Sequence, residues 1–193
     1  MRLGIYVGSF NPVHKGHKFI ADYVIEHNYV DKVLMIPTES YWDKTGLIDL
    51  SHRLNMLKFC ENENILVSSE YSSYEFTNEI LTALNENLDD TELYLIIGAD
   101  NLLKFELWEN IDLILEHKVL VLGRNDIDME EQIKKFTEEQ QEHFVLVKEF
   151  PEVDVSSTSV RNKLESCNFD ELHNELDEKV LQYIINNKLY CKG

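Results

Sequence analysis

Apolar residues in this chain form short continuous runs that alternate with longer stretches of helical periodicity. Continuous apolar runs that end at a turn residue are typical of strands buried on both faces of a parallel sheet. Such runs predict strands over residues 3–7, 32–37, 65–68, 92–98, 118–123 and 144–147. Apolar positions three and four apart predict helices over residues 16–27, 77–88, 102–108, 110–117 and 128–142. A further helix should have Ser51 as its N-cap, and the chain is helical in pattern from Ser156 onward, where Val180, Ile184 and Ile185 would share an apolar face.

Strands that alternate with helices predict an α/β fold with a Rossmann-like, doubly wound parallel sheet, because crossovers between parallel strands are right-handed. The pattern after residue 155 predicts a short C-terminal helical extension. No repeat or linker divides the 193 residues, so we expect a single domain over 1–193 with a helical part at 156–193. Ligands bind outside the carboxyl ends of the strands in such sheets, so polar motifs directly after strands are the candidate site.

The charge is strongly acidic, with 36 Asp and Glu against 18 Lys and Arg and a net charge of −18. Binding to nucleic acid or to an anionic membrane needs clustered Lys and Arg, so we expect neither partner. The first 60 residues nevertheless hold seven Lys and Arg against six Asp and Glu. An acidic protein with an anionic substrate would need such a local positive reserve.

Three cysteines, Cys60, Cys167 and Cys191, lie far apart and form no Cys-x-x-Cys pair. This spacing favours free thiols over a disulfide framework or a cysteine zinc site. The chain has neither the apolar run of a membrane span nor the apolar core of a signal peptide, so we expect a cytoplasmic protein.

The segment after the first predicted strand, residues 8–17, reads Gly-Ser-Phe-Asn-Pro-Val-His-Lys-Gly-His. Its glycines let backbone N–H groups approach an anion, and His14 and His17 lie on one face of the start of a helix. The positive end of the helix dipole adds to the imidazoles, so the segment predicts a phosphate site. Two alternatives stay open: half of a metal site that lacks a third ligand, or ordinary surface histidines.

A second polar segment, residues 155–161, follows the sixth predicted strand and reads Val-Ser-Ser-Thr-Ser-Val-Arg. Ser and Thr cap helices and leave N–H groups free to face an anion, and Arg161 brings a bidentate fork for phosphate oxygens. The alternative is that Ser157 only caps a helix and that Arg161 is solvated.

These two segments resemble the Gly-Ser/Thr-Phe-x-Pro-x-His-x-Gly-His and Ile-Ser-Ser-Thr-x-Ile-Arg motifs of the nucleotidyltransferase superfamily. Within that superfamily, residues 96–124 and the ending at 180–184 with Leu189-Tyr190 resemble nicotinate or nicotinamide mononucleotide adenylyltransferases, over nearly the full chain. In that branch, a Gly-x-Asp-x-Leu segment like residues 98–102 contacts ribose, and a tryptophan at the spacing of Trp108 stacks on the pyridine ring. A helix N-cap remains an alternative for Asp100, and core packing for Trp108.

Residues 41–48 with Arg53 resemble the part of these enzymes that holds the mononucleotide phosphate, and Thr77 matches a threonine near the pyridine substituent. Solvated surface charge is the alternative for Lys44 and Arg53, and helix capping for Thr77. The 43–48 loop departs from the commonest bacterial pattern, so the preference for nicotinate or nicotinamide stays open.

The resemblance implies transfer of AMP from ATP, carried with Mg²⁺, to nicotinate or nicotinamide mononucleotide, with no metal ligands from the protein. The implied catalytic residues are His14, Lys15, His17 and Arg161. The implied ATP-binding residues are Gly8, Ser9, Phe10, Gly16, His17, Gly98, Asp100, Ser156, Ser157, Thr158 and Arg161. The implied mononucleotide-binding residues are Asn11, Lys44, Arg53, Thr77 and Trp108. Alternatives are a phosphopantetheine or cytidylyl transferase, a silent nucleotide-binding module, and a flavodoxin-like electron carrier. The oligomeric state stays open.

Overall fold

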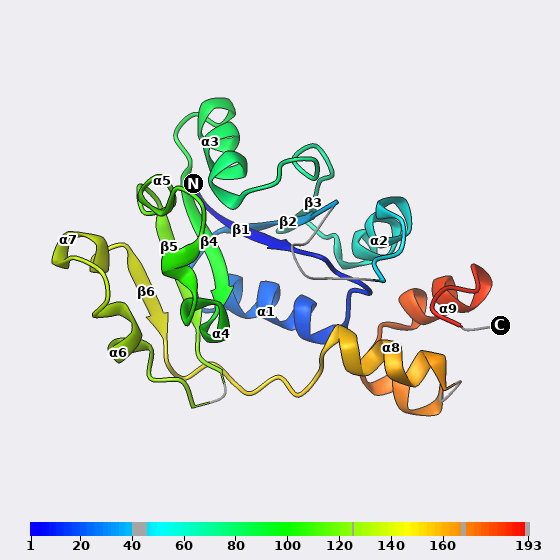
Figure 1. Cartoon of the computed structure of the whole chain (residues 1–193). Helices are drawn as coiled ribbons and strands as arrows, with labels where there is room; N and C mark the ends of the chain where they lie inside the picture. Colours follow the sequence, from blue (N-terminus) through cyan, green and yellow to red (C-terminus); the bar gives the residue numbers. More distant parts are fainter. Residues whose placement is uncertain (40–45, 125, 167–168, 192–193) are drawn as a thin grey trace.

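The computed structural model describes residues 1–39, 46–124, 126–166 and 169–191 (Figure 1). Its centre is a six-stranded parallel sheet in the order β3-β2-β1-β4-β5-β6. The strands are β1 (Arg2–Gly8), β2 (Lys32–Pro37), β3 (Ile65–Val67), β4 (Glu92–Gly98), β5 (Lys118–Leu122) and β6 (Phe144–Val147). The strand order reverses between β1 and β4, which is where ligands bind in doubly wound sheets.

Helices cover both faces of this sheet (Figure 1). They are α1 (Lys15–Glu26), α2 (Leu50–Leu57), α3 (Thr77–Asn87), α4 (Ala99–Leu102), α5 (Ile111–Ile114), α6 (Met129–Ile133), α7 (Glu138–Gln141), α8 (Ser157–Glu165) and α9 (Glu178–Asn186), with 3₁₀ turns η1 (Lys58–Cys60), η2 (Phe105–Leu107) and η3 (Asp170–Asn174). Alternate strand residues point to opposite faces. Ile5 and Leu95 therefore share a core with α3 to α6, while Met35 and Ile96 share a core with α1, α2, α8 and α9.

The sequence-based prediction of a Rossmann-like α/β fold is confirmed. The predicted bounds of β2, β4 and β6 are those of the structure. Two further observations agree with the analysis of composition: Cys60 and Cys191 are free thiols, and no helix among the described residues is long and apolar enough to cross a membrane. Cys167 lies outside the described residues.

Several helix predictions are wrong in detail. The acidic stretch 128–142 forms two short helices, α6 and α7, because Thr137 accepts a hydrogen bond from the Gln140 N–H and so begins a new helix. Asp49, two residues before Ser51, is the N-cap of α2. The stretch 102–108 holds the last residue of α4 and the 3₁₀ turn η2, and the stretch 110–117 holds the four-residue α5.

The C-terminal helices belong to the main core. Val160, Leu164, Leu181 and Ile184 are buried in the same cluster as the apolar face of α1. Ile185 is 42% exposed, so its predicted place on the apolar face of α9 is wrong, because a helix turns about 100° per residue and carries it away from the core.

Ile184→Ala and Ile185→Ala form a matched pair that tests how far α9 contributes to the core. Ile184 is 0% exposed, so its truncation should lower the free energy of unfolding by about 2–5 kcal/mol. The same change at Ile185 should cost less than about 1 kcal/mol. Urea denaturation measures both, and equal losses would contradict the packing of α9 described here.

Candidate active site

The loop after β1 brings the two predicted histidines together at the start of α1. His14 is the N-cap of α1, and its ring stacks on that of His17 with 3.6 Å between centroids. The backbone N–H of His14 donates to Nδ1 of His17 at 3.1 Å. Because Nδ1 of His17 accepts this hydrogen bond, the ring must carry its own proton on Nε2 when it is neutral. The fold therefore fixes the tautomer of His17.

His14 is the more buried of the two imidazoles, at 8% exposure. Burial, with a smaller contribution from the charge of Arg124, lowers the pKa of His14 to about 4. Its Nδ1 has no hydrogen-bond partner among the residues that the structure describes. A buried polar atom without a partner is costly, which marks this ring as part of a functional site rather than of the core.

Lys15 does not lie with the histidines. Its ammonium donates to the backbone carbonyl of His173 at 2.8 Å, and its N–H donates to the carbonyl of Glu175. The catalytic role of Lys15 stays a prediction. The first residue of a helix points away from the face shared by residues 14 and 17, and here it ties α1 to the C-terminal part.

The second predicted motif closes onto the first. Ser157 Oγ donates to the carbonyl of Pro12 at 3.0 Å, and Arg161 donates to the carbonyl of Asn11 at 2.7 Å. A second guanidinium N–H of Arg161 donates to Thr158 Oγ1 at 3.2 Å. We call these contacts between α8 and the carbonyls of Asn11 and Pro12 the clasp. It joins residues that are 145 and 150 positions apart in sequence.

Gly16 allows the two segments to approach. A Cβ atom at this position would lie 2.6 Å from Val153 Cγ1 and 2.8 Å from Val155 Cγ1, so a larger residue would push α1 away from the chain that leads into α8. The cap of α8 is Ser156, whose hydroxyl accepts from the Ser159 N–H at 3.1 Å. Ser157 is therefore not the cap and is free to bind Pro12.

The end of β4 lies beside this loop, since β1 and β4 are neighbouring strands. Gly98 is the N-cap of α4, so Asp100 is not a cap. Oδ1 of Asp100 lies 2.5 Å from where a Gly98 Cβ would stand, so the carboxylate folds over the strand end. Trp108 is partly buried, with its ring centroid 4.9 Å from that of Phe105, so it packs against the core along one side.

Gly8 and Phe10, both predicted to bind ATP, pack against each other. Phe10 is buried and has a φ of 43°, a conformation that bulky residues rarely adopt. Its ring lies 3.2 Å from where a Gly8 Cβ would stand, so a larger residue at Gly8 would displace it. Ser9 is buried beside it. The side chains of Ser9 and Phe10 are therefore packed into the protein, and their role in ATP binding stays a prediction.

Arg53, predicted to bind the mononucleotide, is 1% exposed. Its guanidinium donates to the carbonyls of Ser9 and Thr38 at 2.7 Å each, and to that of Ile48 at 3.0 Å. Burial lowers the pKa of Arg53. Arg53 thus joins the segments that follow β1 and β2. Lys44, the other base predicted to bind the mononucleotide, lies outside the described residues.

Thr77 is half-buried and is the first residue of α3, with Phe76 at the N-cap position, so it does not cap the helix. Three buried polar groups follow β2 and lead into α3: Thr38 Oγ1, Ser72 Oγ and Asn78 Oδ1. They have no hydrogen-bond partner in the described part of the chain. Polar atoms of this kind suit a polar ligand between β2 and α3.

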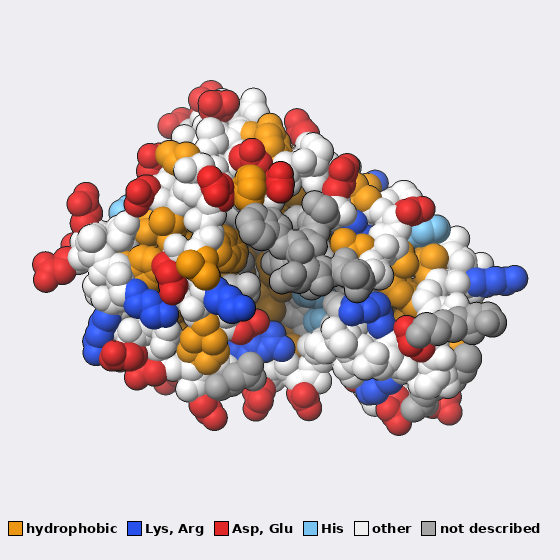
Figure 2. Space-filling view, in the orientation of Figure 1, with side chains coloured by type: hydrophobic (Ala, Val, Ile, Leu, Met, Phe, Trp, Pro, Cys, Tyr) orange, Lys and Arg blue, Asp and Glu red, His pale blue; other side chains and the backbone are white. Residues whose placement is uncertain are grey.

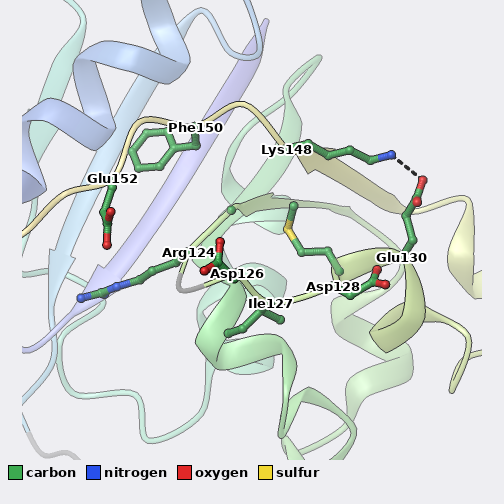
Figure 3. Close-up of a pocket in the computed structure, with 10 residues that line it drawn as sticks. Arg124, Asp126, Ile127, Asp128, Glu130, Lys148, Phe150 and Glu152 are labelled. Carbon is green, nitrogen blue, oxygen red and sulfur yellow. Dashed lines mark hydrogen bonds and ion pairs between the residues drawn. The ribbon is translucent and has the colours of Figure 1, made fainter.

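A cavity of about 360 Å³ lies beyond the ends of β5 and β6, a feature that sequence analysis missed (Figure 3). It is lined by Gly123, Arg124, Asp126, Ile127, Asp128, Met129, Glu130, Lys148, Phe150 and Glu152. In Figure 3, Arg124 extends away from the ion pair of Lys148 with Glu130. Gly123 ends a predicted strand. The rule that ligands bind beyond the carboxyl ends of strands could therefore have pointed to this cavity as well.

Charged side chains are unevenly distributed over the face of the protein shown in Figure 2. Figure 2 shows a hollow near the centre of one face, with a histidine visible in it and Lys and Arg side chains at its rim. Acidic side chains lie mostly around the periphery of that face. Within the described ranges, no group of three or more His, Cys, Asp or Glu side chains could hold a metal ion.

Comparison with known proteins gives a consistent result. A family model described as cytidylyltransferase-like matches residues 5–163. A probable nicotinate-nucleotide adenylyltransferase of Dehalococcoides mccartyi is 32% identical, over 100% of this chain and 98% of that protein. One of Christiangramia forsetii is 30% identical over 98% of each. A solved nicotinic acid mononucleotide adenylyltransferase of Plasmodium falciparum, complexed with NaAD, has a TM-score of 0.81 at 22% identity, covering 98% of this chain and 97% of that one. At that identity the likeness is one of fold.

The buried His14 should make stability depend on pH. In the unfolded chain its pKa is the ordinary value of about 6.5, whereas in the folded protein it is about 4. Between these values the unfolded state binds more protons, so the free energy of unfolding should fall with falling pH, by up to about 3 kcal/mol over the window. Chemical denaturation at several pH values measures this, with His14→Gln as the comparison. A variant that keeps the full slope would contradict the burial of a neutral His14.

Proposed function

We propose that this chain, which belongs to the cytidylyltransferase-like family and within it to the nicotinate-nucleotide adenylyltransferases, joins the AMP moiety of ATP to nicotinate mononucleotide. The product is deamido-NAD, and pyrophosphate is released. The observation that carries the proposal is the clasp, because it joins Arg161 to the loop that carries both imidazoles, at the point where the strand order reverses. We choose the nicotinate form because the relatives are named for it.

The reaction needs positioning and charge neutralisation more than covalent chemistry. An oxygen of the mononucleotide 5′-phosphate attacks the α-phosphorus of ATP, a P–O bond forms, and the bond to the β-phosphate oxygen breaks. Both reactants are polyanions, so the protein must hold them in line and offset negative charge as the pyrophosphate leaves.

We assign His17 to the α-phosphate. Its Nδ1 is occupied by the His14 N–H, so its Nε2–H is the donor that can face a phosphate oxygen. A donor fixed in this way needs no reorientation during the reaction, which is the basis of electrostatic preorganisation. His14, neutral near pH 7 because of its low pKa, is assigned to hold His17 and to contact the same phosphate through its ring.

We assign the β- and γ-phosphates to the start of α8. The N–H groups at a helix start favour anions, and Thr158 and Arg161 lie within the first turns of this nine-residue helix. Arg161 is oriented by its bonds to Asn11 and Thr158, so its fork is held in place before ATP arrives. Mg²⁺ is expected to arrive with these phosphates and to keep several waters.

The two nucleosides are assigned to opposite sides of this centre. The cavity beyond β5 and β6 has apolar walls from Ile127, Met129 and Phe150, and its lining holds four carboxylates against two basic side chains, which suits a base better than a phosphate. Asp100 is assigned to a ribose. The mononucleotide is assigned to the side of β2 and α3, with Trp108 and Thr77 near its pyridine ring and Lys44 near its phosphate.

The first test is pyrophosphate release from ATP and Mg²⁺ with nicotinate or nicotinamide mononucleotide as the acceptor. We expect turnover with nicotinate mononucleotide at a higher kcat/KM than with the amide. Turnover only with another phosphorylated acceptor would contradict the proposed substrate. Silence with every acceptor would contradict the proposed activity.

His17→Ala tests the assignment of the transition-state donor. Loss of one well-placed donor typically costs about 10²–10³ in turnover, and we expect a loss in that range with little change in stability. His27→Ala is the control, because His27 follows the same helix at its other end and stacks on Tyr23. If both variants keep near-full activity, His17 has no part in catalysis.

A further inference from the structure

Tyr190 brings the C-terminal segment back to the candidate active site. Its hydroxyl donates to Oδ1 of Asn11 at 2.8 Å, across 179 positions of sequence. Leu189, one residue earlier, is buried in the core that α1, α8 and α9 share. The segment is therefore anchored by an apolar side chain and ends in a polar contact with the loop after β1.

The backbone here is bent into an uncommon conformation. Lys188 and Tyr190 have φ values of 52° and 64°, in the left-handed region that bulky residues avoid. The turn is held by the Leu189 N–H, which donates to the carbonyl of Ile184 at 3.0 Å. A non-glycine residue kept in this region costs free energy, and such residues cluster at functional sites. The bend aims the phenol at Asn11.

Asn11 is the point to which this contact leads. The residue is 2% exposed, and its side chain serves the loop after β2: Nδ2 donates to the carbonyl of Gly46 at 3.0 Å, and Oδ1 accepts from the Ile48 N–H at 3.4 Å. Its backbone carbonyl instead accepts from Arg161. The side chain and the backbone of Asn11 therefore serve opposite halves of the proposed site, and Tyr190 contacts only the side chain.

The surroundings keep the phenol in its donor form. Burial raises the pKa of Tyr190, while the nearby charges of Arg53 and Arg161 oppose this with smaller effects. A protonated hydroxyl donates to Oδ1, which in turn directs the NH₂ group of Asn11 toward Gly46. Without the hydroxyl, the amide loses its closest partner, and only the bonds to Gly46 and Ile48 then hold its orientation.

We propose that Tyr190 is a positioning residue for the mononucleotide half of the site, acting through the side chain of Asn11 on the loop that contains Gly46 and Ile48. The inference rests on the proposed function, because that function assigns the mononucleotide to the side of β2. It gives Tyr190, which is not among the predicted site residues, a role in the affinity for the mononucleotide.

Tyr190→Phe tests the proposal, because it removes only the hydroxyl. In steady-state pyrophosphate release, KM for nicotinate mononucleotide should rise about five- to tenfold, the effect of one lost hydrogen bond. KM for ATP and kcat should each change less than about twofold. Equal rises in both KM values, or a loss in kcat alone, would overturn the proposal, as would an unchanged KM for the mononucleotide.

Tyr183→Phe is the matched control. The hydroxyl of Tyr183 also joins the C-terminal part to the body of the protein, through Nδ1 of His52 at 2.9 Å and Nδ2 of Asn55 at 3.0 Å, but it does so on α2. We expect it to leave both KM values unchanged even if it lowers the melting temperature. A rise in the KM for the mononucleotide in this variant would mean that any loosening of the C-terminal part has the same effect, and would overturn a specific role for Tyr190.

A double-mutant cycle with Asn11→Ala shows whether Tyr190 acts through Asn11. If it does, adding Tyr190→Phe to Asn11→Ala should raise KM for the mononucleotide no further. Additive effects would overturn the proposed route.

The wild-type protein in the same assay distinguishes a failure of the proposed function from a failure of the role of Tyr190. If the wild-type protein does not use nicotinate mononucleotide, the proposed function is refuted.

Discussion

The site depends on the clasp, in which α8 donates hydrogen bonds to the carbonyls of Asn11 and Pro12. Without these hydrogen bonds, the loop that carries the two histidines would differ little from the loops that follow the other strands. The clasp needs close approach, and Gly16 permits it by leaving room for Val153 and Val155. Arg161 thus ties α8 to the same loop that carries His14 and His17. The same two hydrogen bonds therefore hold the fold together and shape the candidate site.

The strands and the two motifs could be predicted from the sequence because their signals are local. Continuous apolar runs define β2, β4 and β6, and the spacing of His14 and His17 alone places both rings on one face. The family resemblance added the link between the two motifs, which composition cannot supply. The helix bounds from 99 to 142 were harder, since short helices there depend on caps such as Thr137 rather than on periodicity.

The roles of individual cations could not be predicted, because a charge in the sequence says nothing of which atoms surround it in the fold. Lys15 lies between the histidines in sequence, yet its ammonium lies on the C-terminal part. Arg53 follows a loop expected to hold phosphate, yet backbone carbonyls take up its donors. Tyr190 shows the opposite case: it is far in sequence from the two polar motifs, yet its hydroxyl contacts the first of them. Long-range contacts of this kind depend on the topology of the whole chain.

The long sequence separation between the loop after β1 and its contacts also has a consequence for folding during synthesis on the ribosome. Asn11 is made early, but Arg161 follows it by 150 residues and Tyr190 by 179. The loop after β1 must therefore leave the ribosome without the groups that hold it, and it acquires them only in the last stage of synthesis. At about 5–20 residues per second, that interval lasts many seconds. A nascent chain in this state has its histidines but not its arginine, so competence for nucleotide chemistry arrives late and all at once.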